Sequence, residues 1–368
     1  MAASAAALAV AACGSKTACT IEGQVPDEAF YNKMVYLVDS DGKTVLDSAA
    51  TDAQGHFTLK HEAAEPRMAT VQTFAGDYAG GPAFYGQLAV EPGRIYMDIV
   101  NDSLSGTPLN DQLAGYLYNK ERKSATETLR GLAAQLQSAD QQEARDTLMQ
   151  RAMALQETMM NDMRTAASNL FQDNKTNMLG GYALAELAQM EQFTLATLDS
   201  ILATAGPAVA QYEAVSQLRE RLRTVERTSP GHPFIDIKGH TYADSATSSL
   251  AQLIQGKVAV VDFWASWCGP CRQEITESLI PLHKKYQGKG VAVVGVDISD
   301  TPKGLAAAMQ QLSIPYPVLV AEGDAGALYG INSIPQILLV DANGTILARD
   351  LRGEAIEAAV LNALDKKQ

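Results

Sequence analysis

The sequence predicts a multidomain protein with a β-sandwich-like N-terminal domain, a central α-helical region and a C-terminal α/β domain. Short alternating apolar runs, separated by turns that contain Gly and Asp, fill residues 20–105. Apolar residues then recur at three- and four-residue spacing over residues 106–228. In residues 229–368, strand-like apolar runs alternate with helical ones. A chain of 368 residues is long enough for two or three such units.

Residues 1–19 are interpreted as a lipoprotein signal and tether. Residues 1–12 carry no charged side chain and are mostly Ala, and Cys13 follows Val-Ala-Ala and precedes Gly-Ser. This pattern resembles a bacterial lipobox, in which the cysteine is lipidated and becomes the mature N-terminus. The positively charged stretch that usually opens a signal is missing, so an Ala-rich disordered start is the alternative. No later stretch has the ~18 apolar residues of a transmembrane helix.

Two turn signals organise residues 20–105. Ser40-Asp41-Gly42-Lys43 separates two apolar runs, and a second turn, Thr51-Asp52-Ala53-Gln54-Gly55, precedes the alternating run at residues 56–60. Short strands at this spacing are typical of a small sandwich.

A methionine-rich stripe runs along the helical region from Leu148 to Met163. Such a stripe could be a metal-binding or promiscuous binding surface. Apolar residues at helical spacing more often form the buried core between helices, so we expect this stripe to be buried core. The segment Ser229-Pro230-Gly231-His232-Pro233 then marks a linker before the last domain.

Residues 229–368 are expected to form an α/β sheet with helices on its faces. Strands are predicted at residues 257–264, 291–296, 337–340 and 345–348, and helices at 271–286, 305–312 and 354–364. The turn Asp341-Ala342-Asn343-Gly344 joins the last two strands as a hairpin.

Cys268-Gly269-Pro270-Cys271 lies where a buried strand meets a helix. A helix N-terminus presents unpaired amides and a partial positive charge, which favour a thiolate. The i, i+3 spacing brings both sulfurs within disulfide reach. We therefore expect Cys268 to be the exposed attacking thiol and Cys271 the resolving thiol. A C-x-x-C can also be half of a zinc site, but no second ligand pair follows, and we expect neither a metal nor another cofactor.

The segment from Val260 to Cys271 resembles the thioredoxin signature, and this resemblance covers residues 229–368. The long spacing from Cys271 to Pro335 is similar to that of the TlpA/ResA branch of membrane-anchored envelope thioredoxins. This resemblance implies a strand–helix insert around residues 296–325 and a cis peptide bond at Ile334-Pro335, against the disulfide. It implies that the substrate is bound by Trp267, Gly269, Pro270, Ile334 and Pro335. Residues 20–105, with an Ile-Glu-Gly opening and an Asp-x-x-Gly-x-Phe hairpin, resemble a β-rich domain of unknown function found before thioredoxin domains in bacterial envelope lipoproteins.

Two acids complete the candidate site. Asp262 lies inside an apolar strand, where burial should raise its pKa, and it matches the buried acid of thioredoxin that assists proton transfer at the resolving cysteine. Glu274 matches an acid that TlpA/ResA-type proteins place near the active site. The alternatives are a structural strand-end carboxylate and a solvated helix charge. We expect Trp264 and Trp267 to form an apolar rim around the site, and Thr276 stands where many relatives have a helix-kinking proline.

The resemblance implies a periplasm-facing, lipid-anchored protein-disulfide reductase of the cell envelope. Its partners would be protein disulfide substrates and a membrane or envelope electron donor, with cytochrome complex assembly as one possible setting. A net charge of −13 without a basic cluster argues against nucleic acid as a partner. Two alternatives stay open: a ligand-binding lipoprotein with secondary redox activity, and a thiol peroxidase. The second is disfavoured because residues 261–268 lack the Pro-x-x-x-Thr-x-x-Cys setting. The net direction of electron transfer also stays open.

Overall fold

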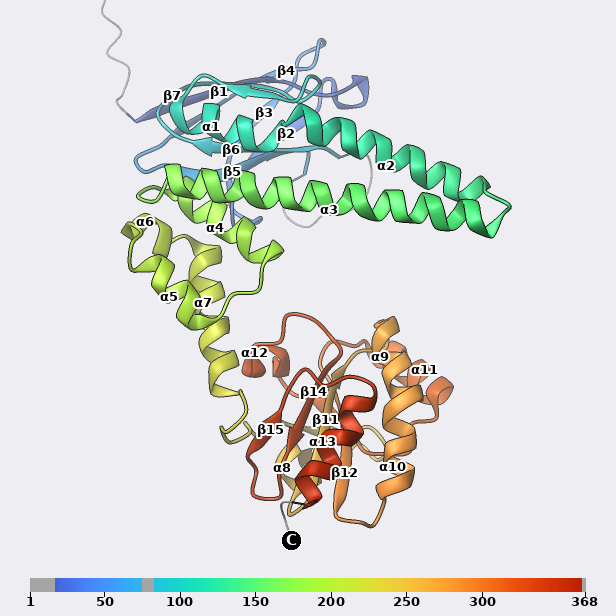
Figure 1. Ribbon diagram of the computed structural model, residues 1–368. Coiled ribbons are helices and arrows are strands. Elements are labelled where there is room, and N and C mark those ends of the chain that lie inside the picture. The colour runs from blue at the N-terminus through green and yellow to red at the C-terminus, as the bar shows by residue number, and fades with distance from the viewer. Residues whose placement is uncertain (1–16, 75–82, 366–368) are drawn as a thin grey trace, which may run out of the picture. The chain divides into compact units, whose positions relative to one another are not determined.

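The computed structural model describes residues 17–74 and 83–365 (Figure 1). The chain divides into two compact units, one of Met1–Phe193 with Thr197–Ser216 and one of Thr194–Ala196 with Gln217–Gln368. The predicted succession of a β-rich, a helical and an α/β part is confirmed. Cys13, the predicted lipidation residue, lies outside the described residues. Within the described ranges, no helix has the length and apolar character needed to cross a bilayer.

The β-rich part consists of two four-stranded sheets, with strand orders β4–β1–β7–β8 and β3–β2–β5–β6. Both predicted turns are present: the Asp39 amide bonds to the Thr44 carbonyl, and the Gly55 amide bonds to the Asp52 carbonyl. Gly55 has a φ of +82°, which a glycine adopts without strain. The strands are β1 (Ala18–Gln24), β2 (Met34–Asp39), β3 (Val45–Ala50), β4 (His56–Glu62), β5 (Arg67–Gln72), β6 (Tyr85–Val90), β7 (Gly93–Asp98) and β8 (Ser103–Ser105).

The helical part begins at residue 108, after β8, the last strand of the β-rich part. Two of its helices, α2 and α3, run side by side as a long hairpin (Figure 1). The helices are α1 (Pro108–Leu117), α2 (Lys120–Ser138), α3 (Gln142–Asp173), α4 (Met178–Met190), α5 (Leu195–Leu202), α6 (Pro207–Ala210) and α7 (Glu213–Arg227).

The expectation that the methionine stripe forms core is wrong. None of its members is buried: Met149 of α3 is 50% exposed. The other members, Leu148, Ala152, Leu155, Met159 and Met163, are half-buried. Only the C-terminal end of α3 contributes buried residues, namely Ala167, Leu170 and Phe171. The physical reason is that α1 and α4 pack against the C-terminal part of α3, whereas its N-terminal part extends beyond them beside α2 (Figure 1). One neighbouring helix cannot enclose an apolar stripe.

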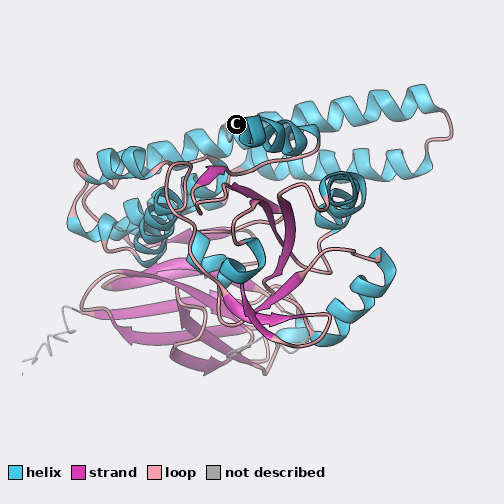
Figure 2. Cartoon of the chain, turned by 90° about the horizontal axis from the view of Figure 1, so that it is seen from below, coloured by secondary structure: helices cyan, strands magenta, loops and turns pink. Residues whose placement is uncertain are grey.

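The C-terminal unit is built on a seven-stranded sheet with the order β10–β9–β13–β12–β11–β14–β15. Strand β11 lies inside this sheet, parallel to β12 and antiparallel to β14, and helices lie around the sheet (Figure 2). The predicted hairpin joins β14 to β15. The strands are β9 (Lys238–Thr241), β10 (Thr247–Ser249), β11 (Val258–Trp264), β12 (Val291–Asp297), β13 (Val318–Ala321), β14 (Gln336–Val340) and β15 (Ile346–Ala348).

Two hydrophobic cores cover the two faces of this sheet. Side chains of α9 (Gly269–Glu274), α10 (Ile280–Tyr286), α11 (Pro302–Leu312) and α13 (Glu354–Asp365) fill one core. Side chains of α8 (Leu250–Ile254) and α12 (Ala325–Tyr329) fill the other. Strand β11 contributes alternate residues to both cores, as the two-residue period of a strand requires. The predicted α/β architecture is therefore confirmed.

The helix predicted over residues 271–286 is continuous but changes its hydrogen-bond spacing. Between α9 and α10, residues Ile275–Leu279 form a π-helical turn, and the Ile280 amide bonds five residues back, to the Ile275 carbonyl. Pro281 follows and has no amide proton to donate, which accounts for the interruption of the α-helical ladder here. Thr276, at the position of the family's proline, donates its hydroxyl to the carbonyls of Arg272 and Gln273 instead.

Candidate active site

Strand β11 carries the acid and leads to the cysteines. All seven of its residues are buried. Val258, Val260 and Trp264 belong to the core that also contains Cys268 and Cys271. By the alternation of a strand, Asp262 faces this same core. The chain leaves the sheet after Trp264 and enters α9 at Gly269, so the sequence places an acid and a dithiol on one side of the sheet within ten residues.

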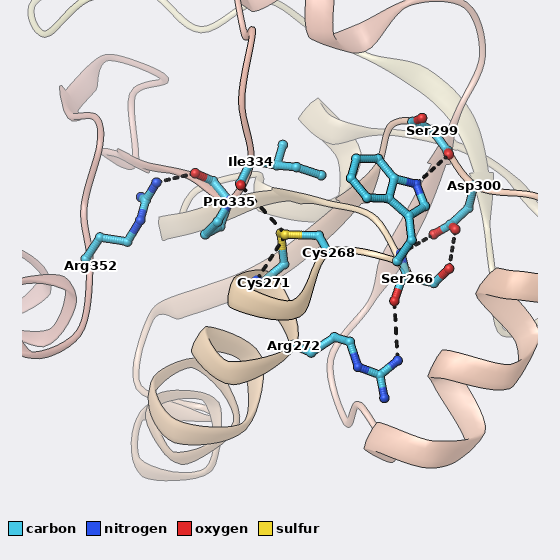
Figure 3. Close-up of a disulfide and its surroundings, with 10 residues drawn as sticks. Ser266, Cys268, Cys271, Arg272, Ser299, Asp300, Ile334, Pro335 and Arg352 are labelled. Atoms are coloured by element: carbon cyan, nitrogen blue, oxygen red, sulfur yellow. Dashed lines mark hydrogen bonds between the residues drawn. A yellow bond between two sulfur atoms is a disulfide. The ribbon is translucent and has the colours of Figure 1, made fainter. Parts of the chain in front are cut away.

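Cys268 and Cys271 form a disulfide, with their Cα atoms 5.3 Å apart (Figure 3). Cys268 is the N-cap of α9, and its Sγ accepts a hydrogen bond of 3.1 Å from the Cys271 amide. That bond and the helix start stabilise negative charge on this sulfur. The expectation that Cys268 is exposed needs correction, because Cys268 is 5% exposed and Cys271 0% in the oxidised form. Cys268 is nevertheless the more accessible of the two, since Cys271 lies one turn deeper.

The peptide bond between Ile334 and Pro335 is cis, as predicted. The Ile334 carbonyl oxygen lies 3.7 Å from the Cys268 Sγ. Pro335 is buried, and its own carbonyl oxygen accepts a hydrogen bond from the Arg352 guanidinium (Figure 3). The loop before β14 therefore lies against the sulfur that is expected to attack substrate.

Asp262 is completely buried, and burial raises its pKa to about 8. The negative charge of Glu274 raises this pKa further, whereas the positive charge of Arg352 lowers it. Neither carboxyl oxygen has a hydrogen-bond partner among the described residues, and the same holds for Trp264 Nε1 and the Tyr316 hydroxyl. The predicted rise in the Asp262 pKa is thus confirmed. The carboxyl lies on the dithiol side of the sheet, as do the other two polar groups just named, those of Trp264 and Tyr316.

Glu274 is held by the backbone rather than left to solvent. Its Oε1 accepts a hydrogen bond of 2.9 Å from the Gly353 amide, at the start of the segment that leads into α13. This contact joins the helix of the dithiol to the loop that also carries Arg352. The interpretation of Glu274 as a solvated helix charge is therefore disfavoured by the structure.

The expected tryptophan rim contains only one of the two tryptophans. Trp264 is 0% exposed, and its indole lies over β12, where a Cβ at Gly295 would come within 3.0 Å of Trp264 Nε1. Trp267 is 66% exposed, and its Nε1 donates to the Ser299 carbonyl at 3.2 Å. The rim prediction is wrong for Trp264, because this residue still belongs to β11 and points into the core.

A clamp around Ser266 was not found from the sequence. The Ser266 amide donates to Asp300 Oδ2 at 2.6 Å, and its hydroxyl donates to Asp300 Oδ1 (Figure 3). The Arg272 guanidinium donates to the Ser266 carbonyl at 3.3 Å. Nearby Asp297 has its pKa raised to about 6 by burial and by the charge of Asp300. These bonds hold the segment before Cys268. The Asp-x-x-Asp pattern that begins at the last residue of β12 was the only available sequence signal for them.

The comparisons with known proteins agree with this geometry. The model of the AhpC/TSA family matches residues 230–349, a range that includes both active-site cysteines. The model of a domain of unknown function, DUF4369, matches residues 19–113, in line with the resemblance noted for the β-rich part.

Three curated relatives illustrate the similarity. The thiol:disulfide interchange protein HelX of Rhodobacter capsulatus is 34% identical over 31% of this chain and 63% of its own length. The thiol:disulfide interchange protein DsbE of Allochromatium vinosum is 33% identical over 37% of this chain and 70% of its own length. The thiol-disulfide oxidoreductase ResA of Bacillus thuringiensis is 27% identical over 30% of this chain and 64% of its own length. The chain thus spans a little under two thirds of HelX and of ResA. The resemblance inferred from the Cys-Gly-Pro-Cys segment is confirmed, and the chain belongs to the thioredoxin-like thiol–disulfide oxidoreductases.

Proposed function

We propose that this protein is a thiol–disulfide oxidoreductase of the cell envelope that reduces disulfides in other proteins. The observation that carries the proposal is the Cys268–Cys271 disulfide, which has the Ile334 carbonyl 3.7 Å from one sulfur and a buried carboxyl on the same side of the sheet. This arrangement contains a nucleophile, a resolving thiol and a proton acceptor, the groups that disulfide exchange requires.

The reaction begins with the reduced dithiol. The Cys268 thiolate, stabilised by the Cys271 amide, attacks one sulfur of the substrate disulfide, and the other substrate sulfur leaves as a thiolate that takes up a proton. A mixed disulfide now joins Cys268 to the substrate. Asp262 accepts the Cys271 proton, and the Cys271 thiolate attacks the Cys268 sulfur, which breaks the mixed disulfide and releases the second substrate sulfur as a thiolate. That thiolate takes up a proton, and Asp262 gives its proton back to solvent. The substrate gains two electrons and two protons, and the protein returns to its Cys268–Cys271 disulfide.

The cis-proline loop is proposed to bind the substrate. Ile334 is half-buried beside the attacking sulfur, so its backbone can pair with an extended substrate segment. The exposed indole of Trp267, together with Gly269 and Pro270, completes the contact surface. An extended backbone partner fits a protein substrate better than a small thiol.

We further propose that the protein is anchored to a membrane through a lipid on Cys13 and faces the periplasm. The small residues before Cys13 support this. Electrons for re-reduction of the disulfide would come from a membrane or envelope donor, because the proposed reaction leaves the protein oxidised after each turnover.

Two cysteine variants test the mechanism. Cys268→Ser should abolish insulin-disulfide reduction, whereas Cys271→Ser should accumulate mixed disulfides, because attack proceeds and resolution fails. Cys19→Ser, which changes a buried free cysteine, serves as the control. Near-wild-type activity in both active-site variants would contradict the mechanism. Rapid hydrogen-peroxide consumption that depends on Cys268 would identify a peroxidase instead.

The net direction of transfer is decided by the potential of the dithiol couple. Equilibration with glutathione, followed by mass measurement of the alkylated protein, gives this potential. A value nearer ~−270 mV than ~−120 mV agrees with a reductase, because these are the potentials of thioredoxin and of the oxidant DsbA. A value near the second figure would point to an oxidase.

A further inference from the structure

The loop between β15 and α13 reaches two parts of the redox site at once. Arg352 donates one hydrogen bond to the Pro335 carbonyl and another, of 2.6 Å, to the Leu351 carbonyl. The next residue, Gly353, donates its amide to Glu274 at 2.9 Å. The Leu351 amide bonds to the Ile337 carbonyl at 3.3 Å, which fixes the loop to the start of β14.

We propose that Arg352 is a positioning residue of the redox site, which holds the cis-proline loop and keeps a positive charge beside Asp262. This role rests on the proposed function, because it concerns how substrate and proton are handled during disulfide exchange. Arg352 itself is exposed and does not need to touch the reacting sulfurs.

The first part of the role is geometric. The guanidinium sets the position of the Pro335 carbonyl (Figure 3). It bonds the carbonyl of Leu351 at the same time. A planar guanidinium can make both bonds from one side chain, whereas the single ammonium of a lysine cannot reproduce this forked arrangement. Pro335 directly follows Ile334, whose carbonyl lies beside Cys268. Arg352 therefore controls where the proposed substrate-binding backbone lies.

The second part is electrostatic. The charged or titratable groups on this side of Asp262 are Glu274 and Cys271 from α9, Arg352 from its loop and Tyr316 from the segment before β13. On the neighbouring strands, Asp262 pairs with Gly295 of β12 and with Ile337 of β14, which carry no charge. Asp297, at the end of β12, lies on the same face of the sheet and pairs with Trp264, and it does not act on the pKa of Asp262. Arg352 favours the ionised carboxylate, and Glu274 disfavours it. Ionised Asp262 is the form that accepts the Cys271 proton, so the two side chains should act on resolution with opposite signs.

Three variants of the full-length protein separate these roles. Arg352→Gln should move the acid limb of the pH–turnover profile to higher pH, and Glu274→Gln should move it to lower pH. A displacement of one unit lowers or raises turnover on the acid side about tenfold. Arg352→Lys keeps the charge, so its acid limb should stay in place while its KM for a protein substrate rises. Lys257→Gln, just before the start of β11, removes a charge far from Asp262 along the strand and is the matched control.

A direct readout of Asp262 does not depend on turnover. In protein labelled with ¹³C at the aspartate carboxyls, the buried carboxyl should titrate at higher pH in Arg352→Gln than in wild type, and at lower pH in Glu274→Gln. Arg352→Lys also serves as the folded charge-retaining form if Arg352→Gln does not fold. The proposal would be overturned if the Asp262 pKa shifted in the same direction in Arg352→Gln and Glu274→Gln, or shifted in neither. A wild-type protein without reductase activity, but with the opposite shifts intact, would refute the proposed function and leave the electrostatic role standing.

Discussion

Replacement of Asp262 by Asn should give the C-terminal domain a stability advantage over the wild type that grows as the pH rises. The carboxyl is completely buried with a pKa of about 8, against about 3.8 for an exposed aspartate. Below about pH 4 the group is protonated in both the folded and the unfolded protein. Between about pH 4 and pH 8 the unfolded chain releases the proton and the folded chain keeps it, so the free energy of unfolding falls with pH.

The size of this effect follows from the pKa difference. Each pH unit in the window costs about 1.4 kcal/mol, and a window of roughly four units gives an upper bound of about 5–6 kcal/mol. Asn has a similar volume and no charge, so Asp262→Asn should lack this pH dependence. A buried amide without partners carries its own cost of about 1–3 kcal/mol, but that cost does not change with pH. The quantity to measure is therefore the difference in the free energy of unfolding between Asp262→Asn and the wild type, and how that difference changes between about pH 4 and pH 8.

Tryptophan emission gives a clean assay, because both tryptophans of the chain, Trp264 and Trp267, lie in the C-terminal unit. Urea unfolding of the oxidised protein followed by this emission reports that unit separately from the rest of the chain. Asp350→Asn, which replaces an exposed carboxylate in a left-handed conformation that Asn also tolerates, is the control. Parallel stability-against-pH curves for wild type and Asp262→Asn would refute the reasoning. In the same variant, resolution of the mixed disulfide should slow by about 10–100-fold, because the proton acceptor is gone.

Three further outcomes are expected. Mass spectrometry of the mature protein from a native host should find a lipid on Cys13, and an unmodified N-terminus that begins elsewhere would contradict the anchor. Arg349→Met should lower the free energy of unfolding of the C-terminal unit by about 2–3 kcal/mol in urea melts, because buried Thr228 and the Tyr329 carbonyl lose a charged donor. An unchanged midpoint would show that these bonds contribute nothing. Gly239→Ala should destabilise the same unit by about 1–3 kcal/mol, because the added Cβ would come within 2.1 Å of the carbonyl oxygen of Val320 on the paired strand. An unfolding midpoint equal to that of the wild type would mean that β9 can shift to make room for the Cβ.

Features encoded within one short segment were predictable from the sequence. Cys268 and Cys271 lie at a strand–helix junction that both residue pattern and motif indicate, and Asp262 lies in a run so apolar that burial and a raised pKa follow. The cis bond before Pro335 was predicted from family spacing rather than from local chemistry. Periodicity also predicted the order of β-rich, helical and α/β parts, because strand and helix patterns differ in their repeat.

Other features depended on which distant segments meet. Arg352 and Asp300 are 84 and 32 residues from Cys268, and no local pattern marks either as part of the site. The residue type alone could not show that Trp264 is buried and Trp267 exposed. The difference depends on where β11 ends, because Trp264 still belongs to the strand and points into the core. The methionine stripe of α3 had the period of a core helix, yet burial requires neighbours on several sides, and the N-terminal part of α3 has only α2 beside it.

The sequence by itself determined the redox chemistry, because the nucleophile, the resolving thiol and the helix start that activates them lie within four consecutive residues. Only the tertiary structure decided how that chemistry is supported. The charges acting on Asp262 come from Glu274 and from Arg352, which are brought together by a loop between β15 and α13. Electrostatic and hydrogen-bond effects fall off with distance in space, not with separation along the chain, so the partners of a buried carboxyl become visible only when the fold is known.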